Sequence, residues 1–109
     1  MADLNVNELL YGYLDPGVDV TFYFWGDNNS YNKKKNKARF FSITPDPLFP
    51  FPQGVVELLP TVLDFQVIRT WTTVWADIDD NRVFQTNVEV QNIGTASGGF
   101  HLIEAETDN

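Results

Sequence analysis

The chain has 109 residues, of which 43% are hydrophobic and 15% aromatic, with no Cys and a formal net charge of −8. This length predicts a single domain over residues 1–109, and nine Phe, four Tyr and three Trp supply the apolar surface for its core. The acidic balance argues against a nucleic-acid partner, because phosphate contacts need a surplus of Lys and Arg. The missing Cys excludes disulfides, thiolate metal sites and cysteine nucleophiles.

The amino-terminal region carries no pattern typical of a targeting signal. Its first fifteen residues lack Lys and Arg and lack a continuous apolar run. This is compatible with a cytosolic chain or with one whose leader has been removed, so localisation stays open. The longest apolar stretch, residues 18–25, is interrupted by Asp19 and Thr21 and falls short of the ~20 residues that a membrane helix needs, so we expect no membrane span.

Alternation with a period of two predicts strands in the first half of the chain, and only residues 5–10 approach a helical pattern. Residues 18–25 form a predicted strand whose buried side carries Val18, Val20, Phe22 and Phe24. Residues 37–44 are the predicted returning strand, and residues 55–59 form a short one.

The second half of the chain continues the strand pattern. Residues 61–76 form a long β-rich run whose alternation changes phase near Val67 and Ile68, which predicts a bulge or a switch between sheets. A polar hairpin connection leads into a strand at residues 82–92 with one buried and one solvated side, and residues 100–106 form the last strand. These elements predict an all-β domain of six to eight antiparallel strands in a sandwich or barrel, and two packed sheets accommodate the apolar sides.

Residues 88–102 read VEVQNIGTASGGFHL, a strand, an Asn-x-Gly turn and a second strand. This segment, in the final third of the chain, resembles bacterial immunoglobulin-like adhesion modules of the CARDB type. The turn at Pro16 and Gly17 and the aromatic strand that ends in Trp25 and Gly26 are similar to the opening of small bacterial β-sandwich domains. The resemblance implies an immunoglobulin-like sandwich in an extracellular or accessory setting, without catalysis, and it assigns no binding residue.

Catalytic chemistry has few candidates in this sequence. The one His, His101, stands between Phe100 and Leu102 on a predicted strand, where we expect a surface or interface residue. No serine-nucleophile, phosphate-loop or zinc-protease motif occurs. We therefore expect no enzyme. A glycoside hydrolase is the remaining catalytic alternative, and its candidate carboxylates are Asp19, Asp64, Glu89, Glu104 and Glu106.

An acidic cluster lies in the predicted hairpin connection. Asp77, Asp79 and Asp80 bring together oxygen ligands of the kind that Ca²⁺ prefers. A full calcium loop needs Gly and Glu at positions that Arg82 and Val88 occupy here. We therefore expect a polar turn and no cofactor, with a Ca²⁺ site at the three aspartates as the alternative.

The aromatic residues are the strongest indication of a binding role, because flat rings bind the apolar faces of sugars and anchor protein interfaces. On an extended strand Trp71 and Trp75 share one side, which forms a two-ring platform if that side faces solvent. Burial of at least one Trp between the sheets is the competing expectation. The predicted ligand-binding residues are Tyr23, Trp25, Asn28, Asn29, Trp71 and Trp75.

Two further segments have the composition of contact surfaces. Four prolines in residues 45–54 predict a stiff connection, in which Leu48, Phe49 and Phe51 either close one end of the core or form a surface for self-association. Five of the seven basic residues lie within residues 33–39. They form either a solvated loop that protects an edge strand, or a grip for an anionic glycan or a neighbouring copy.

Together these features predict a non-catalytic interaction module, carbohydrate-binding or adhesive, whose partner is a glycan or a protein surface. The alternative is a structural protein that assembles into a homo-oligomer or filament through the proline-rich segment and exposed strand edges. We expect a homo-oligomer in both cases.

Overall fold

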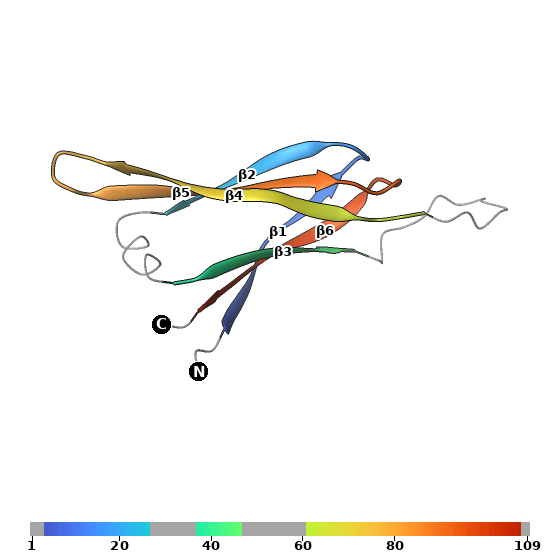
Figure 1. Ribbon diagram of the computed structural model, residues 1–109, viewed down its shortest axis with the longest axis horizontal. Coiled ribbons are helices and arrows are strands. Elements are labelled where there is room, and N and C mark those ends of the chain that lie inside the picture. Colours follow the sequence, from blue (N-terminus) through green and yellow to red (C-terminus); the bar gives the residue numbers. More distant parts are fainter. Residues whose placement is uncertain (1–3, 27–36, 47–60, 108–109) are drawn as a thin grey trace.

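Six β-strands make up the described part of the chain, which comprises residues 4–26, 37–46 and 61–107 of the computed structural model (Figure 1). The strands are β1 (Leu4–Leu14), β2 (Asp19–Gly26), β3 (Arg39–Pro45), β4 (Phe65–Ala76), β5 (Arg82–Asn92) and β6 (Gly98–Thr107). Within these ranges no helix is long and apolar enough to cross a membrane.

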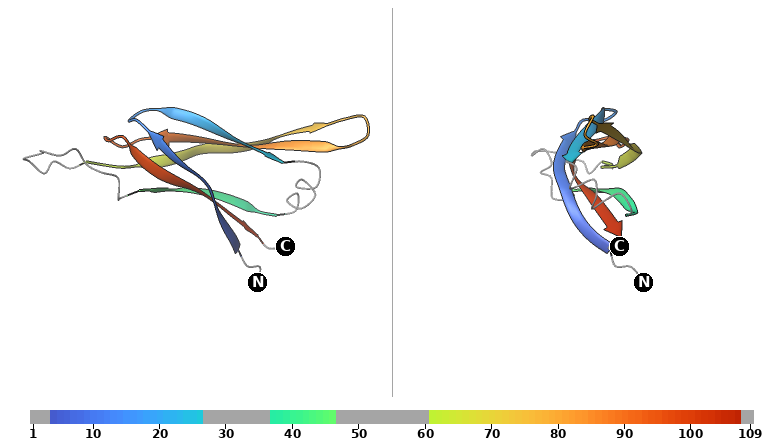
Figure 2. Two further views of the ribbon diagram at one scale, coloured as in Figure 1. Left: turned by 180° about the vertical axis from the view of Figure 1, so that it is seen from behind. Right: turned by 90° about the vertical axis from the view of Figure 1, so that its left-hand side faces the viewer.

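The strands form two antiparallel three-stranded sheets, in the orders β1-β6-β3 and β2-β5-β4. Figure 2 shows the two sheets as layers that face each other. β5 and β6 are the central strands of their sheets. The predicted all-β class and small antiparallel β-sandwich are therefore confirmed, while the immunoglobulin-like assignment remains a prediction.

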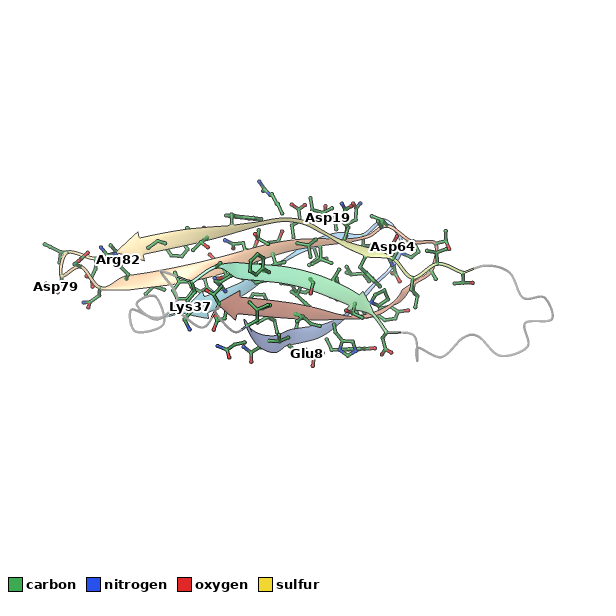
Figure 3. The ribbon with its side chains drawn as sticks, turned by 60° about the horizontal axis from the view of Figure 1, so that its bottom comes forward. Glu8, Asp19, Lys37, Asp64, Asp79 and Arg82 are labelled. Carbon is green, nitrogen blue, oxygen red and sulfur yellow. The ribbon has the colours of Figure 1, made fainter. Side chains whose placement is uncertain are left out.

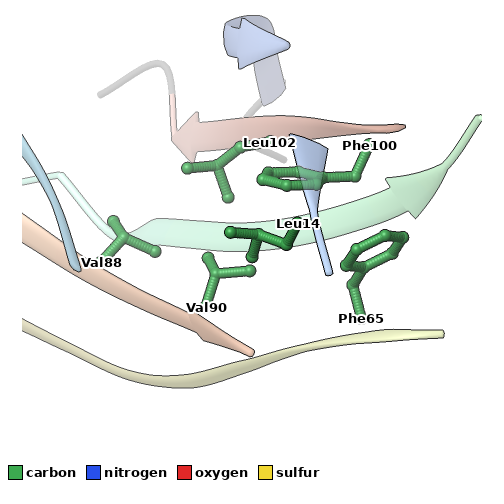
Figure 4. Close-up of a cluster of buried hydrophobic side chains, with 6 residues drawn as sticks. All are labelled: Leu14, Phe65, Val88, Val90, Phe100 and Leu102. Atoms are coloured by element: carbon green, nitrogen blue, oxygen red, sulfur yellow. The ribbon is translucent and has the colours of Figure 1, made fainter. Parts of the chain in front are cut away.

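Apolar side chains of both sheets meet in a core between the layers (Figure 4). Its buried members are Leu14, Phe65, Val88, Val90, Phe100 and Leu102. Val20, Phe22 and Phe24 of β2 pack against them, as the alternation of that strand predicts. Phe41 and Ile43 of β3 do the same from the other layer. Burying one such side chain stabilises the fold by roughly 1.5–3 kcal/mol, so these contacts hold the two sheets together.

Residues 5–10, which come nearest to a helical pattern in the sequence, belong to β1 and pair with β6. The register shifts between Glu8 and Leu10, and both Leu9 and Leu10 pack against the core. Two adjacent core-facing residues at a bulge break the alternation of a strand and imitate helical spacing.

Most other strand predictions agree with the structure to within a few residues. The bounds of β5 match residues 82–92, and the phase change near Val67 is confirmed as a register shift between Val67 and Arg69. Val18 precedes β2 and is 39% exposed, so its predicted burial is wrong. The predicted strand at residues 55–59 lies outside the described residues.

Asn92 organises the connection between β5 and β6 from a fully buried position. Its Nδ2 donates hydrogen bonds of 2.9 Å to the carbonyls of Leu14 and Ala96. Its Oδ1 accepts a hydrogen bond of 2.9 Å from the N–H of Gly94. A Cβ at Gly94 would lie 2.2 Å from the carbonyl oxygen of Val62, so this close approach requires glycine. The Asn-x-Gly pattern therefore ties β1, β5 and the segment before β4 together.

The interior becomes polar along β6. Glu104 continues the inward side that Phe100 and Leu102 begin, and it is 2% exposed. Arg39 of β3 places its Nη2 2.6 Å from Oε2 of Glu104 and donates from Nη1 to Oγ1 of Thr86 at 2.9 Å. Because Thr86 belongs to β5, these contacts link the two sheets where the apolar core ends.

Candidate functional site

Four aromatic side chains lie on the outer side of the β2-β5-β4 sheet. Tyr23 and Trp25 of β2 are 57% and 64% exposed, because their neighbours along the strand face the core. Trp71 and Trp75 of β4 are on the same side, because they pair with outward-facing residues of β5. Two polar residues of β5 lie between the aromatic residues of β2 and those of β4. We call the six residues the aromatic face: Tyr23, Trp25, Trp71, Trp75, Gln85 and Asn87.

The aromatic face contains a pair of stacked indoles. The rings of Trp25 and Trp75 have centroids 5.3 Å apart and an interplanar angle of 21°. They come from the two strands that flank β5, opposite Gln85 and Val83 respectively. The predicted platform of Trp71 and Trp75 does not form this pair, because four residues along a strand separate them by about 14 Å. Trp25 and Trp75 lie in rows only two residues apart, and their long side chains stack across β5.

Trp71 makes a different contact. The guanidinium of Arg69 lies 4.2 Å from the Trp71 ring centroid, a cation–π geometry. The same Arg69 donates from Nε to Oε1 of Glu89 at 3.2 Å. Sequence reasoning did not place Arg69 at the site, although its spacing of two residues from Trp71 on a strand is the signal that could have found it.

Asn87 lies in the middle of the aromatic face and is nevertheless only 1% exposed. Its register position is directly between Tyr23 and Trp71. Its Nδ2 donates to the carbonyl of Trp71 at 3.1 Å and to the carbonyl of Gln85 at 3.3 Å. The prediction of a solvated side for β5 is therefore wrong at Asn87, because large neighbouring side chains cover it and its amide has partners in the protein.

None of the three Trp residues lies in the core, so the expectation of a Trp between the sheets is wrong. The cause is the bulge at the start of β4. Phe65 and Val67 face the core before it. Trp71 and Trp75 are odd-numbered, as Phe65 and Val67 are. After the register shift, however, the odd-numbered residues of β4 face outward.

The remaining predicted contact residues are not all within the described ranges. Asn28, Asn29, Leu48, Phe49 and Phe51 lie outside them, as does most of the basic run. His101 is described: it is half-buried on the outer side of the β1-β6-β3 sheet, and its ring meets that of Tyr11 edge-on at 5.0 Å. Its Nδ1 contacts Oε1 of Glu8.

The acidic cluster forms the tip of the β4–β5 hairpin, at the opposite end of the sheet from Asp64 (Figure 3). Oδ1 of Asp77 accepts hydrogen bonds of 2.9 Å from the N–H groups of Asp79 and Asn81. These hydrogen bonds hold the pKa of Asp77 below its ordinary value, and the bonds from Asn81 contribute most. Asp80 adopts a positive φ of 60° and pairs with Arg82 at 3.1 Å. The described residues contain no group of three or more His, Cys, Asp or Glu side chains arranged to hold a metal ion.

The candidate carboxylates are distributed over different surfaces. Glu89 lies on the outer side of the β2-β5-β4 sheet beside Arg69, and Asp19 is exposed at the start of β2. Glu104 is buried between the sheets, and Glu106 has Lys37 3.9 Å away. Glu104 and Glu106 are thus separated from Glu89 by the sheet that carries it.

The fold and the aromatic face define a small antiparallel β-sandwich with an exposed aromatic sheet surface. Comparison of the chain with protein-family models, with curated proteins and with solved structures finds no match in any of the three. The resemblance of residues 88–102 to adhesion modules therefore stays a prediction.

Proposed function

We propose that the chain is a non-catalytic carbohydrate-binding module whose ligand lies on the aromatic face. The observation that carries this proposal is the stacked pair of Trp25 and Trp75, which are 64% and 48% exposed on one sheet surface. Exposing this much indole surface to water is unfavourable unless a ligand covers it, and aromatic rings are the usual partners of the C–H faces of sugars.

The polar groups around the rings supply hydrogen bonds for sugar hydroxyls. Gln85 of β5 pairs with Trp25 of β2, and Thr73 of β4 pairs with Gln85 from the other side. About 7 Å along the strand separate the row of Gln85 from the row of Tyr23 and Trp71. A ligand that contacts both rows is therefore an oligosaccharide rather than a single sugar.

The charges on this surface favour a neutral ligand. Arg69 is already paired with Glu89 and stacked on Trp71, so its charge is balanced within the protein. The net charge of −8 repels an anionic glycan at long range. We therefore expect neutral oligosaccharides to bind better than uronic or sulfated ones.

Intrinsic fluorescence tests the proposal directly, because all three Trp residues of the chain belong to the aromatic face. Titration with a panel of neutral oligosaccharides is expected to change Trp emission saturably, and calorimetry gives the affinity. Trp25→Ala and Trp75→Ala should each weaken binding at least ~10-fold. Phe40→Ala, on the outer side of the other sheet, is the control and should bind as the wild type does. A flat response across the panel, or equal weakening by the control, would contradict the proposal.

A further inference from the structure

One border of the β2-β5-β4 sheet is formed by β4, and part of this border is open. In the described part of the chain β4 pairs with β5 alone, so the backbone N–H and C=O groups on its other border have no strand partner. On the core side of β4, Thr70, Thr72 and Val74 are exposed, although they pair with buried residues of β5. Figure 1 shows that the hairpin end of β4 and β5 extends beyond β2 and β3. A further strand can therefore reach this border.

The sequence of this border favours strand pairing. Residues 70–76 read TWTTVWA, a stretch without a charge, a Pro or a Gly. Thr, Val and Trp are residues that strands prefer, and an uncharged edge of this kind is a template for another strand. The bulge of β4 lies at Ile68, just before these residues, so it does not interrupt them.

The other three border strands carry protective features. β1 has a register shift between Glu8 and Leu10. β3 is seven residues long, begins with Arg39 and ends with Pro45. β2 has one charged residue, Asp19, and no basic residue that could face it in a symmetric pairing. Natural sheets avoid edge pairing by means of bulges, short strands, Pro and charges, so β4 is the strand on which pairing is expected.

We propose that β4 of a second copy of this chain pairs with this border, antiparallel and centred on Thr73. The order of residues on both sides of Thr73 supports a second copy rather than an unrelated peptide. Antiparallel pairing about Thr73 places Arg69 opposite Asp77 of the second copy, and the two-fold symmetry places Asp77 opposite Arg69 in return. Both ends of the uncharged stretch thus form pairs of opposite charge, which stabilise a strand pairing and fix its register.

Arg69 is available for this contact. Its side chain is 67% exposed beside Glu89. A guanidinium has five N–H donors, so Arg69 can bind Asp77 of the second copy while it stays paired with Glu89.

The side chains between the charged ends are also compatible with this register. Trp71 lies opposite Trp75 of the second copy, and Thr72 lies opposite Val74 of the second copy. Pairs of aromatic or β-branched residues are favourable across antiparallel strands. The pairing of residues 69–77 makes a smaller contact than a standard protein interface, so we expect a reversible dimer.

This pairing has a consequence for the aromatic face. Residues that lie directly opposite each other in antiparallel strands point to the same side of the sheet. The two copies therefore form one six-stranded sheet in the order β2-β5-β4-β4-β5-β2, and their aromatic faces join into a single surface. A long ligand can contact both copies at once. This consequence rests on the proposed function, whereas the dimer itself does not.

Sedimentation velocity of the 109-residue chain, from micromolar to millimolar concentration, tests the charge pairs. We expect a monomer–dimer equilibrium in the wild type. Arg69→Glu and Asp77→Lys should each raise the dissociation constant at least ~10-fold, because each places like charges opposite one another. An equimolar mixture of the two variants should regain the dimer content of the wild type, because their heterodimer has opposite charges at both ends. Arg82→Glu makes the same charge change on β5 and should leave the dissociation constant within about twofold.

Disulfide cross-linking tests the same register without a change of charge, in case Asp77→Lys disturbs the hairpin turn. The chain has no Cys, and Thr73 is the residue that faces itself across the two-fold axis. Thr73→Cys should therefore form a disulfide-linked dimer on mild oxidation. The control is Thr21→Cys, because Thr21 is also a half-buried Thr on the outer side of a border strand, β2, and it should cross-link far more slowly.

A wild type that stays monomeric at millimolar concentration would overturn the proposal. So would a mixture of folded Arg69→Glu and Asp77→Lys that is no more dimeric than either variant alone, with circular dichroism as the measure of folding. Equal cross-linking of Thr73→Cys and Thr21→Cys would also refute this register. None of these measurements uses a glycan, so failure of the dimer is distinguishable from failure of the proposed function.

Discussion

Tyr11 of β1 reaches across the central strand β6 and donates a hydrogen bond of 2.8 Å from its hydroxyl to Oδ2 of Asp46, just after β3. The phenol passes over Gly99, where a Cβ would lie 2.1 Å from the hydroxyl oxygen. The backbone N–H of Asp46 donates to the carbonyl of Gly99 at 3.0 Å, so the same three residues connect all three strands of the sheet.

Gly99→Ala should destabilise the protein by roughly 1–3 kcal/mol, because the added methyl group displaces the Tyr11 ring from Asp46. Tyr11→Phe removes only the hydroxyl and should destabilise the protein less than Gly99→Ala does. Urea denaturation measures both values. A Gly99→Ala variant as stable as the wild type would show that Tyr11 does not occupy this position in solution.

The hydrogen bond to Asp46 also predicts a pH dependence. This hydrogen bond is the largest of the causes that raise the pKa of Tyr11 above 10.0, because the bond stabilises the neutral phenol. A raised pKa in the folded state contributes stability that is present below pH 10.0 and is lost as the pH rises through the folded value. Thermal melts should therefore show an extra alkaline loss of stability in the wild type that Asp46→Asn reduces. NMR titration of the Tyr11 ring measures the pKa itself, and a value at or below that of a free tyrosine would refute the expectation.

The buried pair of Arg39 and Glu104 should matter far more than the exposed pair of Arg69 and Glu89. Glu104→Ala leaves the Arg39 guanidinium without its carboxylate between the sheets, which should cost ~3–5 kcal/mol. Glu89→Ala serves as the control and should cost less than about 1 kcal/mol, because the Arg69 side chain is 67% exposed. Denaturant unfolding compares the two variants. Similar losses in both would contradict the burial of the first pair.

Asp77 predicts a second pH dependence, at the opposite end of the scale. The hydrogen bonds from Asn81 and Asp79 lower its pKa below 3.8, so the stability that they contribute is present above pH 3.8 and is lost as the pH falls through the folded value. Asp77→Asn removes the titration and should flatten the dependence of the melting temperature on pH below 4. Melts of both proteins between about pH 2 and pH 6 make the comparison. Identical acid profiles would show that the carboxylate does not hold the turn.

The bulge in β4 can be examined by deletion of Ile68. Val67 pairs with Val90 and Arg69 pairs with Glu89, so Ile68 is the extra residue. Its removal should restore a regular ladder and leave Trp71 and Trp75 outside, with unchanged quenching of Trp fluorescence by acrylamide. If the ladder were regular in the wild type, Trp71 and Trp75 would lie on the core side with Phe65 and Val67, and the same deletion would turn both rings outward and increase the quenching.

Much of the architecture follows from local sequence. Strict alternation at Val20, Phe22 and Phe24 identified β2, its buried side and the exposure of Tyr23 and Trp25. The same reasoning gave the bounds of β5 and the irregularity near Val67. Alternation is readable because each residue's side in a strand depends only on its neighbours along the chain.

Only the tertiary structure decided how the site is assembled. The pairing of Trp25 with Trp75, the burial of Asn87 and the contact between Arg39 and Thr86 each join strands that are distant in sequence. The order of strands and the number of residues in a bulge set these contacts, and a one-residue change in register exchanges the two sides of a strand. The sequence by itself therefore determined that strands form and which residues alternate. The packing of the two sheets determined which side of β4 became surface.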